Sequence, residues 1–340
     1  MIGCALHPDN DSRETSPFKR ADSAVGPLTY IDTHAHLWSV EYLDAIATLG
    51  AKDTAVARNI RATNSASDLK DRLQMMDDAG VKCQVLSATP QQPQWGDNRD
   101  AHQLAQSIND LYATLIKQYP GRFMAYGAVP LPHVDEAIKE ARRAITKLNF
   151  QGIGLNTLVQ NKYSLADPRF LPFFEELNRL KTVVYIHPTG CGANSRMIND
   201  YHLEWVIGAP MEDTIAVLQL LKADVPRRFP HIRFHVAHLG GVLPFLMQRI
   251  EDNYTDWNAF QSSPWETLRN FWFDTANFHK ESLRCSRDTF GFAQLLLGSD
   301  FPYFQDDKYT RAVRYIQSSA LDTYEQEAIL ITNAKRLYGL

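Results

Sequence analysis

Short apolar runs alternate with segments of helical periodicity along most of the chain, and this alternation most constrains the fold. Residues 97–119, for example, carry Leu104, Ile108 and Leu111 at spacings of four and three, as one buried helical face requires. Strands separated by such helices predict a parallel sheet with crossover connections. The apolar runs are eight: 30–36, 83–88, 123–129, 152–157, 182–187, 232–238, 271–276 and 294–300. The helical segments are 97–119, 133–148, 169–180, 211–223, 242–260 and 323–337.

Eight strand–helix units predict an α/β fold of the (β/α)8 type, the TIM barrel, rather than an open sheet. The 340 residues could form two domains, but barrels with insertions reach this length as one. The sequence has no GxGxxG or Walker loop, which argues against a nucleotide-binding sheet. We therefore expect one domain over residues 28–340. Residues 1–27 are polar, lack the apolar core of a signal peptide, and predict a tail.

Two connections are longer than an ordinary strand-to-helix loop. They are Trp38–Ala66, after the first strand, and Thr189–Pro210, after the fifth. Loops that follow the strands of a barrel lie on its catalytic face. These two insertions are therefore candidate lids or substrate walls.

Histidine and aspartate side chains close four of the apolar runs. His34 and His36 are two residues apart on one strand, so their rings point to the same side. His187, His238 and Asp300 each end a further run. Because the carboxyl ends of all strands meet at one face of a barrel, these five side chains predict a metal site there.

Imidazole nitrogen and carboxylate oxygen are ligands that suit zinc, and catalytic sites keep one position open. We expect His34, His36, His187 and Asp300 to hold one divalent metal, with zinc favoured and manganese as the alternative. His238 then remains to act as a general acid or base or to hold an oxyanion. Each residue taken alone could be structural, and Asp300 could simply cap the following helix. His235, near His238 in the sequence, is expected to face the helices. Asp32, near His34, is expected either to orient a ligand or only to begin the strand.

These runs resemble the amidohydrolase superfamily, and in particular its mononuclear branch around aminocarboxymuconate-semialdehyde decarboxylase and the salicylate and resorcylate decarboxylases. The motifs that carry the resemblance are Asp32-Thr33-His34-Ala35-His36, Ile186-His187-Pro188, Ala237-His238-Leu239-Gly240-Gly241 and Gly298-Ser299-Asp300-Phe301-Pro302. The resemblance implies metal ligation by His34, His36, His187 and Asp300, with His238 as the catalytic histidine.

The resemblance extends to residues 244–249, where the matching arginine of the family binds substrate carboxylate across a dimer interface. It therefore implies a substrate role for Arg249 and a homodimer or higher homo-oligomer. A surface arginine without that role is the alternative.

The fourth strand run lacks the carboxylated lysine with which binuclear members bridge two metals. Residues 152–158 read Gly-Ile-Gly-Leu-Asn-Thr-Leu, and Lys162 comes several residues too late. The absence favours a single metal and disfavours a urease-like or phosphotriesterase-like site.

Within this branch the resemblance implies non-oxidative decarboxylation of a hydroxylated aromatic acid, such as a methylsalicylate or hydroxybenzoate, or of a related carboxylic acid. A metal would orient and polarise the substrate as a Lewis acid, and Asp300 or His238 would manage the proton. Hydrolysis or hydration of a lactone, amide or C–C bond is the alternative, because hydrolases use the same five residues. A barrel with purely structural zinc is disfavoured, since these ligands come from distant strands.

Besides Arg249, four residues are candidates for substrate binding. Trp95 and Tyr303 could stack on a ring, and Arg61 or its neighbour Arg58 could pair with a carboxylate. Packing for the aromatic residues and solvation for the arginines are the alternatives.

Charge and cysteine usage exclude other classes. The net charge of −4 gives no general attraction to nucleic acid, and no apolar stretch approaches the ~20 residues that span a bilayer. Four scattered cysteines without CxxC spacing favour reduced thiols and a cytoplasmic location. We therefore expect a small carboxylic acid as the substrate and no nucleic-acid or membrane partner.

Overall fold

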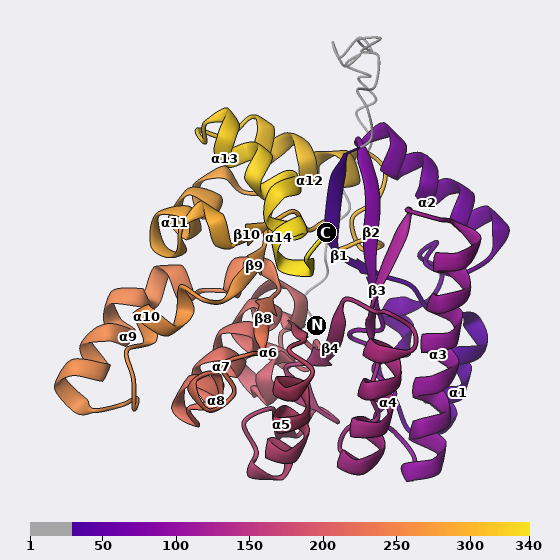
Figure 1. The fold of residues 1–340 in the computed structure, drawn as a ribbon, viewed down its shortest axis with the longest axis horizontal. Helices are drawn as coiled ribbons and strands as arrows, with labels where there is room; N and C mark the ends of the chain where they lie inside the picture. The colour runs from indigo at the N-terminus through magenta and orange to yellow at the C-terminus, as the bar shows by residue number, and fades with distance from the viewer. Residues whose placement is uncertain (1–28) are drawn as a thin grey trace, which may run out of the picture.

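The computed structural model describes residues 29–340, so the predicted tail at 1–27 lies outside the described residues. Eight parallel strands form one sheet in the order β1-β2-β3-β4-β7-β8-β9-β10. Helices surround these strands (Figure 1). The strands are β1 Tyr30–His36, β2 Val81–Ser87, β3 Phe123–Gly127, β4 Gly152–Asn156, β7 Val183–His187, β8 Arg233–Val236, β9 Trp272–Asp274 and β10 Leu295–Leu296. A short hairpin, β5 Leu158–Val159 with β6 Tyr163–Ser164, follows β4.

The segment that follows β10 closes the sheet into a barrel by returning to β1. The amide of Thr33 donates to the carbonyl of Leu297 at 2.8 Å, and the amide of Asp300 donates to the carbonyl of His34 at 2.9 Å. Ala35 also forms a parallel bridge with Phe301. The prediction of a (β/α)8 barrel is confirmed.

Every predicted helical segment contains a helix. In α3, for example, Asp97 caps the first turn and Leu104, Ile108 and Leu115 are buried. Helices α9 and α10 extend outward from the barrel (Figure 1). The helices are α1 Val40–Thr48, α2 Ala66–Asp78, α3 Asn98–Gln118, α4 Val134–Thr146, α5 Leu171–Arg179, α6 Arg196–Asn199, α7 Ala209–Lys222, α8 Val225–Arg228, α9 Leu243–Trp257, α10 Pro264–Leu268, α11 Lys280–Phe290, α12 Asp307–Gln317, α13 Thr323–Glu327 and α14 Asn333–Tyr338.

The barrel interior is filled by large side chains, and one of them contradicts a prediction. Tyr126 and Tyr185 stack on each other there with ring centroids 4.9 Å apart. His235 is fully buried beside them, 4.7 Å from the Tyr185 ring and hydrogen-bonded to the Tyr126 hydroxyl at 2.8 Å. The expectation that His235 faces the helices was wrong. It assumed that the strand pattern continues to His238, whereas β8 ends at Val236 and the chain turns there.

The two insertions contain short helices. The first includes α1 and a 3-10 turn at Thr54–Ala57. The second includes a 3-10 turn at Gly192–Asn194, α6, and a π-helix at Glu204–Gly208 that leads directly into α7. π-Helical turns are rare, and those that occur are often found at functional sites.

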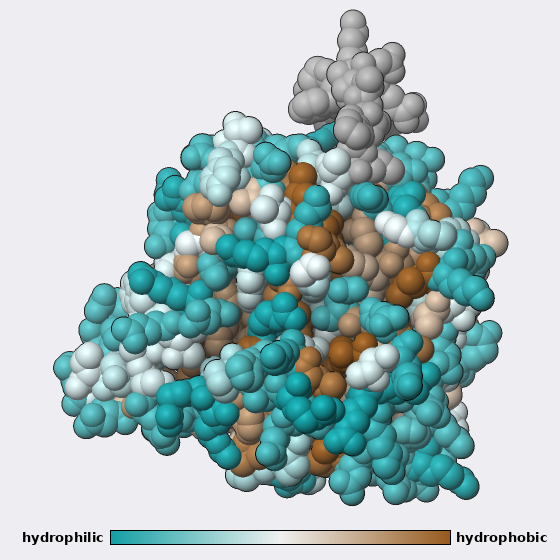
Figure 2. Space-filling model, viewed as in Figure 1, coloured by the Kyte–Doolittle hydropathy of each residue, from teal (hydrophilic) through white to brown (hydrophobic). Residues whose placement is uncertain are grey.

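Hydrophilic side chains predominate on the face shown in Figure 2, and hydrophobic side chains appear there in separate small groups. Among the described residues, none of the helices combines the length and hydropathy that crossing a bilayer requires.

Candidate active site

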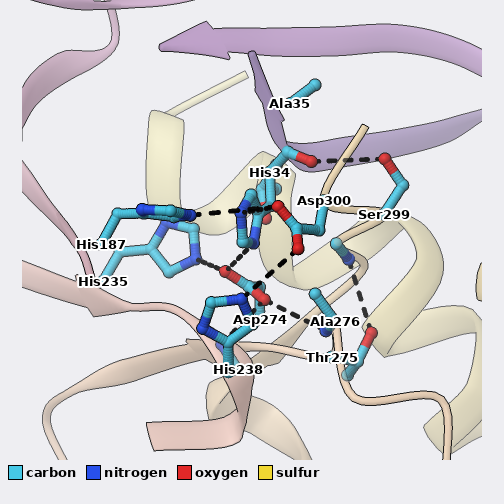
Figure 3. Close-up of polar contacts among 12 residues, drawn as sticks. His34, Ala35, His187, His235, His238, Asp274, Thr275, Ala276, Ser299 and Asp300 are labelled. Atoms are coloured by element: carbon cyan, nitrogen blue, oxygen red, sulfur yellow. Dashed lines mark hydrogen bonds and ion pairs between the residues drawn. The ribbon is translucent and has the colours of Figure 1, made fainter. Parts of the chain in front are cut away.

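Three histidine rings converge on one carboxylate oxygen at the carboxyl ends of the strands. The Nε2 atoms of His34, His36 and His187 lie 3.1, 3.2 and 3.9 Å from Oδ1 of Asp300. The Nε2 atoms of His34 and His36 are 3.2 Å apart. Figure 3 shows His34, His187 and Asp300 directed at this point. Four donors that each lie about 2.1 Å from one tetrahedral metal are about 3.4 Å apart, so the arrangement fits a single ion.

The protonation states of His36 and His187 also fit metal ligation. Nδ1 of His187 donates to the carbonyl of Pro188 at 2.8 Å, so Nε2 carries the lone pair, and this buried atom has no hydrogen-bond partner. Burial lowers the pKa of His187 to about 3 and that of His36 to about 4. Nδ1 of His36 contacts the hydroxyl of Ser87 at 2.9 Å. Neutral rings with Nε2 directed at a common centre are what a metal ion requires.

A buried carboxylate that the sequence reasoning missed lies behind His34. Oδ2 of Asp274 lies 3.0 Å from Nδ1 of His34 and 3.3 Å from Nε2 of His235 (Figure 3). Burial opposes a charge on His34, but Asp274 and Asp300 raise its pKa to about 9. Asp274 ends β9 as His187 ends β7, and this shared position was the signal that could have found it.

His238 lies at the rim of the same site in a strained backbone conformation. Its φ of 55° is in the left-handed region, which a non-glycine residue adopts at a cost of about 1–3 kcal/mol. Nδ1 of His238 lies 2.9 Å from Oδ2 of Asp213, on α7, and Nε2 lies 3.6 Å from Oδ2 of Asp300. Burial disfavours a charge on this ring, yet the two carboxylates raise its pKa well above the usual value. Asp213 was not predicted, because an acidic residue on an apolar helix gives no distinctive signal.

Two overlapping donor sets are therefore present. Donor atoms of His34, His187, His238 and Asp300 all lie within 4.8 Å of one another. The predicted set has His36 in place of His238. His36 approaches Oδ1 of Asp300, as His34 and His187 do, whereas His238 approaches Oδ2 and is held by Asp213. His36 thus shares the approach of His34 and His187 to one oxygen of Asp300, and His238 does not.

A cavity of about 270 Å³ opens beside these residues and has aromatic walls. Trp205, on the π-helix, stacks on Tyr303 with centroids 6.0 Å apart and an interplanar angle of 29°. The indole lies over Gly190, where an added Cβ would be 2.3 Å from it. Trp205 was not predicted, because only the fold brings the second insertion over the site. The lining residues are His187, Trp205, Val206, Ala209, Pro210, His238, Ala276, Asn277, Phe278, Asp300, Tyr303 and Phe304.

Of the predicted substrate residues, only Tyr303 lines this cavity. Arg61 pairs with Asp306 at 2.7 Å on the surface. Trp95 is half-buried against the core, and Arg249 is exposed on α9. Arg58, the other arginine of the first insertion, pairs with Asp44 at 2.8 Å.

Asp32 acts on the backbone rather than on a ligand ring. Its Oδ2 accepts from the Ser299 hydroxyl at 2.6 Å, and its Oδ1 accepts from the amides of Ser299 and His34 at 3.0 and 3.2 Å. Asp32 therefore fastens the segment that carries Asp300 to the strand that carries His34 and His36.

Comparison with known proteins finds one family model that matches residues 31–340, described as amidohydrolase. A 2-amino-3-carboxymuconate-6-semialdehyde decarboxylase of Dictyostelium discoideum is 33% identical over 238 residues, which are 68% of this chain and 66% of that relative. The decarboxylase yanB of Aspergillus niger is 30% identical over 91% of this chain and 87% of its own length. A 2-keto-4-carboxy-3-hexenedioate hydratase of Sphingobium is 27% identical over 82% and 83%.

Solved structures show the same fold. A 2,6-dihydroxybenzoate decarboxylase in complex with 2,6-dihydroxybenzoate superimposes with a TM-score of 0.81 at 23% identity, over 92% of this chain and 99% of that one. A dihydroxybenzoic acid decarboxylase from Polaromonas, with bound manganese and the inhibitor 2-nitroresorcinol, has a TM-score of 0.79 at 20% identity, over 92% and 97%.

Proposed function

The chain belongs to the amidohydrolase family, and on this basis we propose that it is a metal-dependent decarboxylase of a hydroxylated aromatic acid or a related carboxylic acid. The observation that carries the proposal is the convergence of three histidine Nε2 atoms on Oδ1 of Asp300, beside a fourth histidine that contacts the other oxygen. A metal centre with an adjacent proton donor suits the exchange of a carboxylate for a proton.

In this proposal His34, His36, His187 and Asp300 hold one divalent metal. When bound, the metal would supply Lewis-acid polarisation and orient the substrate. Zinc and manganese both accept three nitrogens and one oxygen. Because the Polaromonas decarboxylase contains bound manganese, manganese is as strong a candidate as zinc for this site.

His238 delivers the proton that replaces the departing carboxylate. In non-oxidative decarboxylation the carbon–carboxylate bond breaks, CO₂ leaves, and one proton is added to the same carbon. Asp213 favours the protonated form of His238 and fixes its ring, so that Nε2 faces Asp300 at the cavity. Asp300 is the second group that can hold this proton, as the sequence predicted.

The cavity favours a small, planar acid. Its volume of about 270 Å³ lies below the ~300–1,000 Å³ of sites for drug-sized ligands, and Trp205, Tyr303 and Phe278 supply flat apolar walls. Among the described residues that line it, none is a lysine or arginine. A second carboxylate on the substrate would therefore need a cation from elsewhere.

A homodimer would supply that cation. Arg249 is exposed on α9, which projects from the barrel (Figure 1), and so lies where a second copy of the chain could receive it. Phe245 and Trp257 on the same helix are 84% and 79% exposed. Large apolar side chains of this kind are typical of interfaces. We propose that Arg249 enters the neighbouring site and binds the substrate carboxylate.

The test is a screen of hydroxybenzoates and related acids for CO₂ release, with metal analysis of the same sample. The proposal predicts CO₂ in a one-to-one ratio with the acid consumed and loss of activity on chelation. The alternative is a hydrolase or hydratase, and the similarity to the Sphingobium hydratase supports it. Such an enzyme would consume water and release no CO₂. Turnover that survives complete removal of metal would contradict both.

A further inference from the structure

Arg72 is a fully buried arginine behind the metal site, and it does not touch the cavity. It lies on α2 and is 1% exposed. Among residues 29–340, none of the carboxylates forms an ion pair with it, although arginine is seldom buried unless paired. A buried cation without a directly bound anion is costly, so its contacts require a physical reason.

The guanidinium contacts both of the segments that carry metal-ligating residues. Its Nη2 donates to the backbone carbonyl of His36 at 2.5 Å. Its carbon atom Cζ lies 4.2 Å from the ring centroid of Phe301, the residue after Asp300, in a cation–π arrangement. The amide of His36 in turn donates to the carbonyl of Phe301 at 2.7 Å. One side chain thus fixes His36 relative to Asp300.

The compensating negative charge is Asp32, which is reached through one amide. Nη1 of Arg72 donates to Oε1 of Gln84 at 3.3 Å, and Nε2 of Gln84 donates to Oδ2 of Asp32 at 2.9 Å. The Tyr309 hydroxyl donates to the same oxygen at 3.1 Å. All of these groups are buried. Since Asp32 also holds Ser299, the network from Arg72 reaches the segment of Asp300 a second time.

We propose that Arg72 is a positioning residue of the metal site, which sets the separation of the His36 and Asp300 ligands without contacting metal or substrate. The inference rests on the metal site of the proposed function. Its physical basis is that a site preorganised for an ion loses affinity when the partners behind its ligands are removed, typically 10–100-fold.

The test compares the affinity of three purified variants for Zn²⁺ alone, by competition with a chromogenic chelator. Arg72→Met, which keeps much of the side-chain volume without its donors, should bind Zn²⁺ 10–100-fold more weakly than the wild type. Arg72→Lys should fall between the two, because an ammonium group can donate to the His36 carbonyl but lacks the planar fork that also reaches Gln84 and stacks on Phe301. Circular dichroism of each apo protein at the assay temperature checks that it is folded.

Arg233→Met is the matched control. Arg233 likewise makes two hydrogen bonds, here to the backbone carbonyls of Leu337 and Lys181, but at the opposite end of the barrel. This variant should retain wild-type Zn²⁺ affinity whatever it does to the melting temperature. If Arg72→Met does not fold, Gln84→Met, which removes the link to Asp32, replaces it under the same criterion.

The outcomes separate this inference from the proposed function. Wild-type Zn²⁺ affinity, within twofold, in folded Arg72→Met overturns the positioning role and leaves the metal site standing. An equal loss of affinity in Arg72→Met and Arg233→Met also overturns it, because the effect would then be general destabilisation. A wild-type protein that binds neither Zn²⁺ nor Mn²⁺ overturns the proposed function and this inference together.

Discussion

At the scale of single residues, the chemistry depends on carboxylates that lie one contact behind the histidines. Asp274 contacts His34, and Asp213 contacts His238. Such partners orient the ring and set which nitrogen carries the proton. In the proposed function the two histidines differ in role: His34 presents Nε2 to the ligand cluster, and His238 donates a proton beside the cavity.

Asp213→Asn tests the role of His238. The Asp213 carboxylate raises the pKa of His238, so its removal lowers that pKa. The protonated donor is then lost at a lower pH than in the wild type, and the alkaline limb of the kcat–pH profile should move to lower pH. We expect kcat at neutral pH to fall. The upper limit of this fall is about 10²–10⁴-fold, because that is the whole contribution typical of a general acid. The metal content should stay intact.

The conservative exchange leaves little change in volume, and Asp110→Asn on the surface of α3 serves as its control. An alkaline limb at the wild-type position in Asp213→Asn would show that His238 is not the titrating donor.

The proximity of the five candidate side chains could be predicted because each closes an apolar run, and the carboxyl ends of barrel strands meet. His34, His36, His187, His238 and Asp300 are all brought together. The structure does not bring Arg61, Arg249 or Trp95 to this cluster. The order of the strands does not determine where a residue in a loop or on an outer helix lies. Asp213 and Trp205 were missed for the same reason.

At the scale of elements, the second insertion builds one wall of the cavity. The buried Glu212, on α7, accepts hydrogen bonds from the hydroxyls of Thr157 and Thr189, both at 2.8 Å, and so ties this insertion to the barrel. The π-helix then places Trp205 over Gly190 and against Tyr303. The wall therefore depends on a glycine as much as on the tryptophan.

Trp205→Ala and Gly190→Ala should both raise KM for the substrate and leave the metal content unchanged. Loss of an aromatic stacking partner is worth about 0.5–1.5 kcal/mol beyond its buried area, so at least a several-fold rise in KM is expected. Gly190 has φ +79° and an alanine Cβ would collide with the indole.

Gly121→Ala is the matched control for Gly190→Ala. Gly121 has nearly the same φ, +76°, but a Cβ there would meet nothing within 4 Å. Both variants carry the same backbone strain, and only Gly190→Ala displaces Trp205. Equal KM values in the two would show that Trp205 does not contact substrate.

Element order was predictable because hydrophobic periodicity records burial, but strand ends were not. The sequence predicts one strand over 232–238, whereas β8 stops at Val236. Residues 238–241 then all have positive φ. Because of this turn, the His238 side chain points to the site and His235 stays inside the barrel. The two-residue alternation of side chains along a strand cannot predict such a turn. The two glycines in the turn were its only visible sign.

At the scale of the whole molecule, the proposed dimer predicts complementation between two defective chains. Arg249→Ala should raise KM strongly and keep its metal, because a charge-assisted bond to carboxylate is lost. His238→Ala should lose turnover. Hybrid dimers of the two have one pocket with both residues native, so mixing under conditions that exchange subunits should restore activity. A fully active monomer in sedimentation would refute the shared site, as would mixtures that stay inactive.

The most direct test of the metal centre is the metal content of two variants, His36→Ala and His238→Ala, measured beside the wild type by elemental analysis after dialysis. The two histidines are close neighbours in the site, yet only His36 meets the same Asp300 oxygen as His34 and His187. We predict about one metal per chain in the wild type and in His238→Ala, and little in His36→Ala. Metal retained in His36→Ala but lost from His238→Ala would contradict the assignment and place His238 among the ligands.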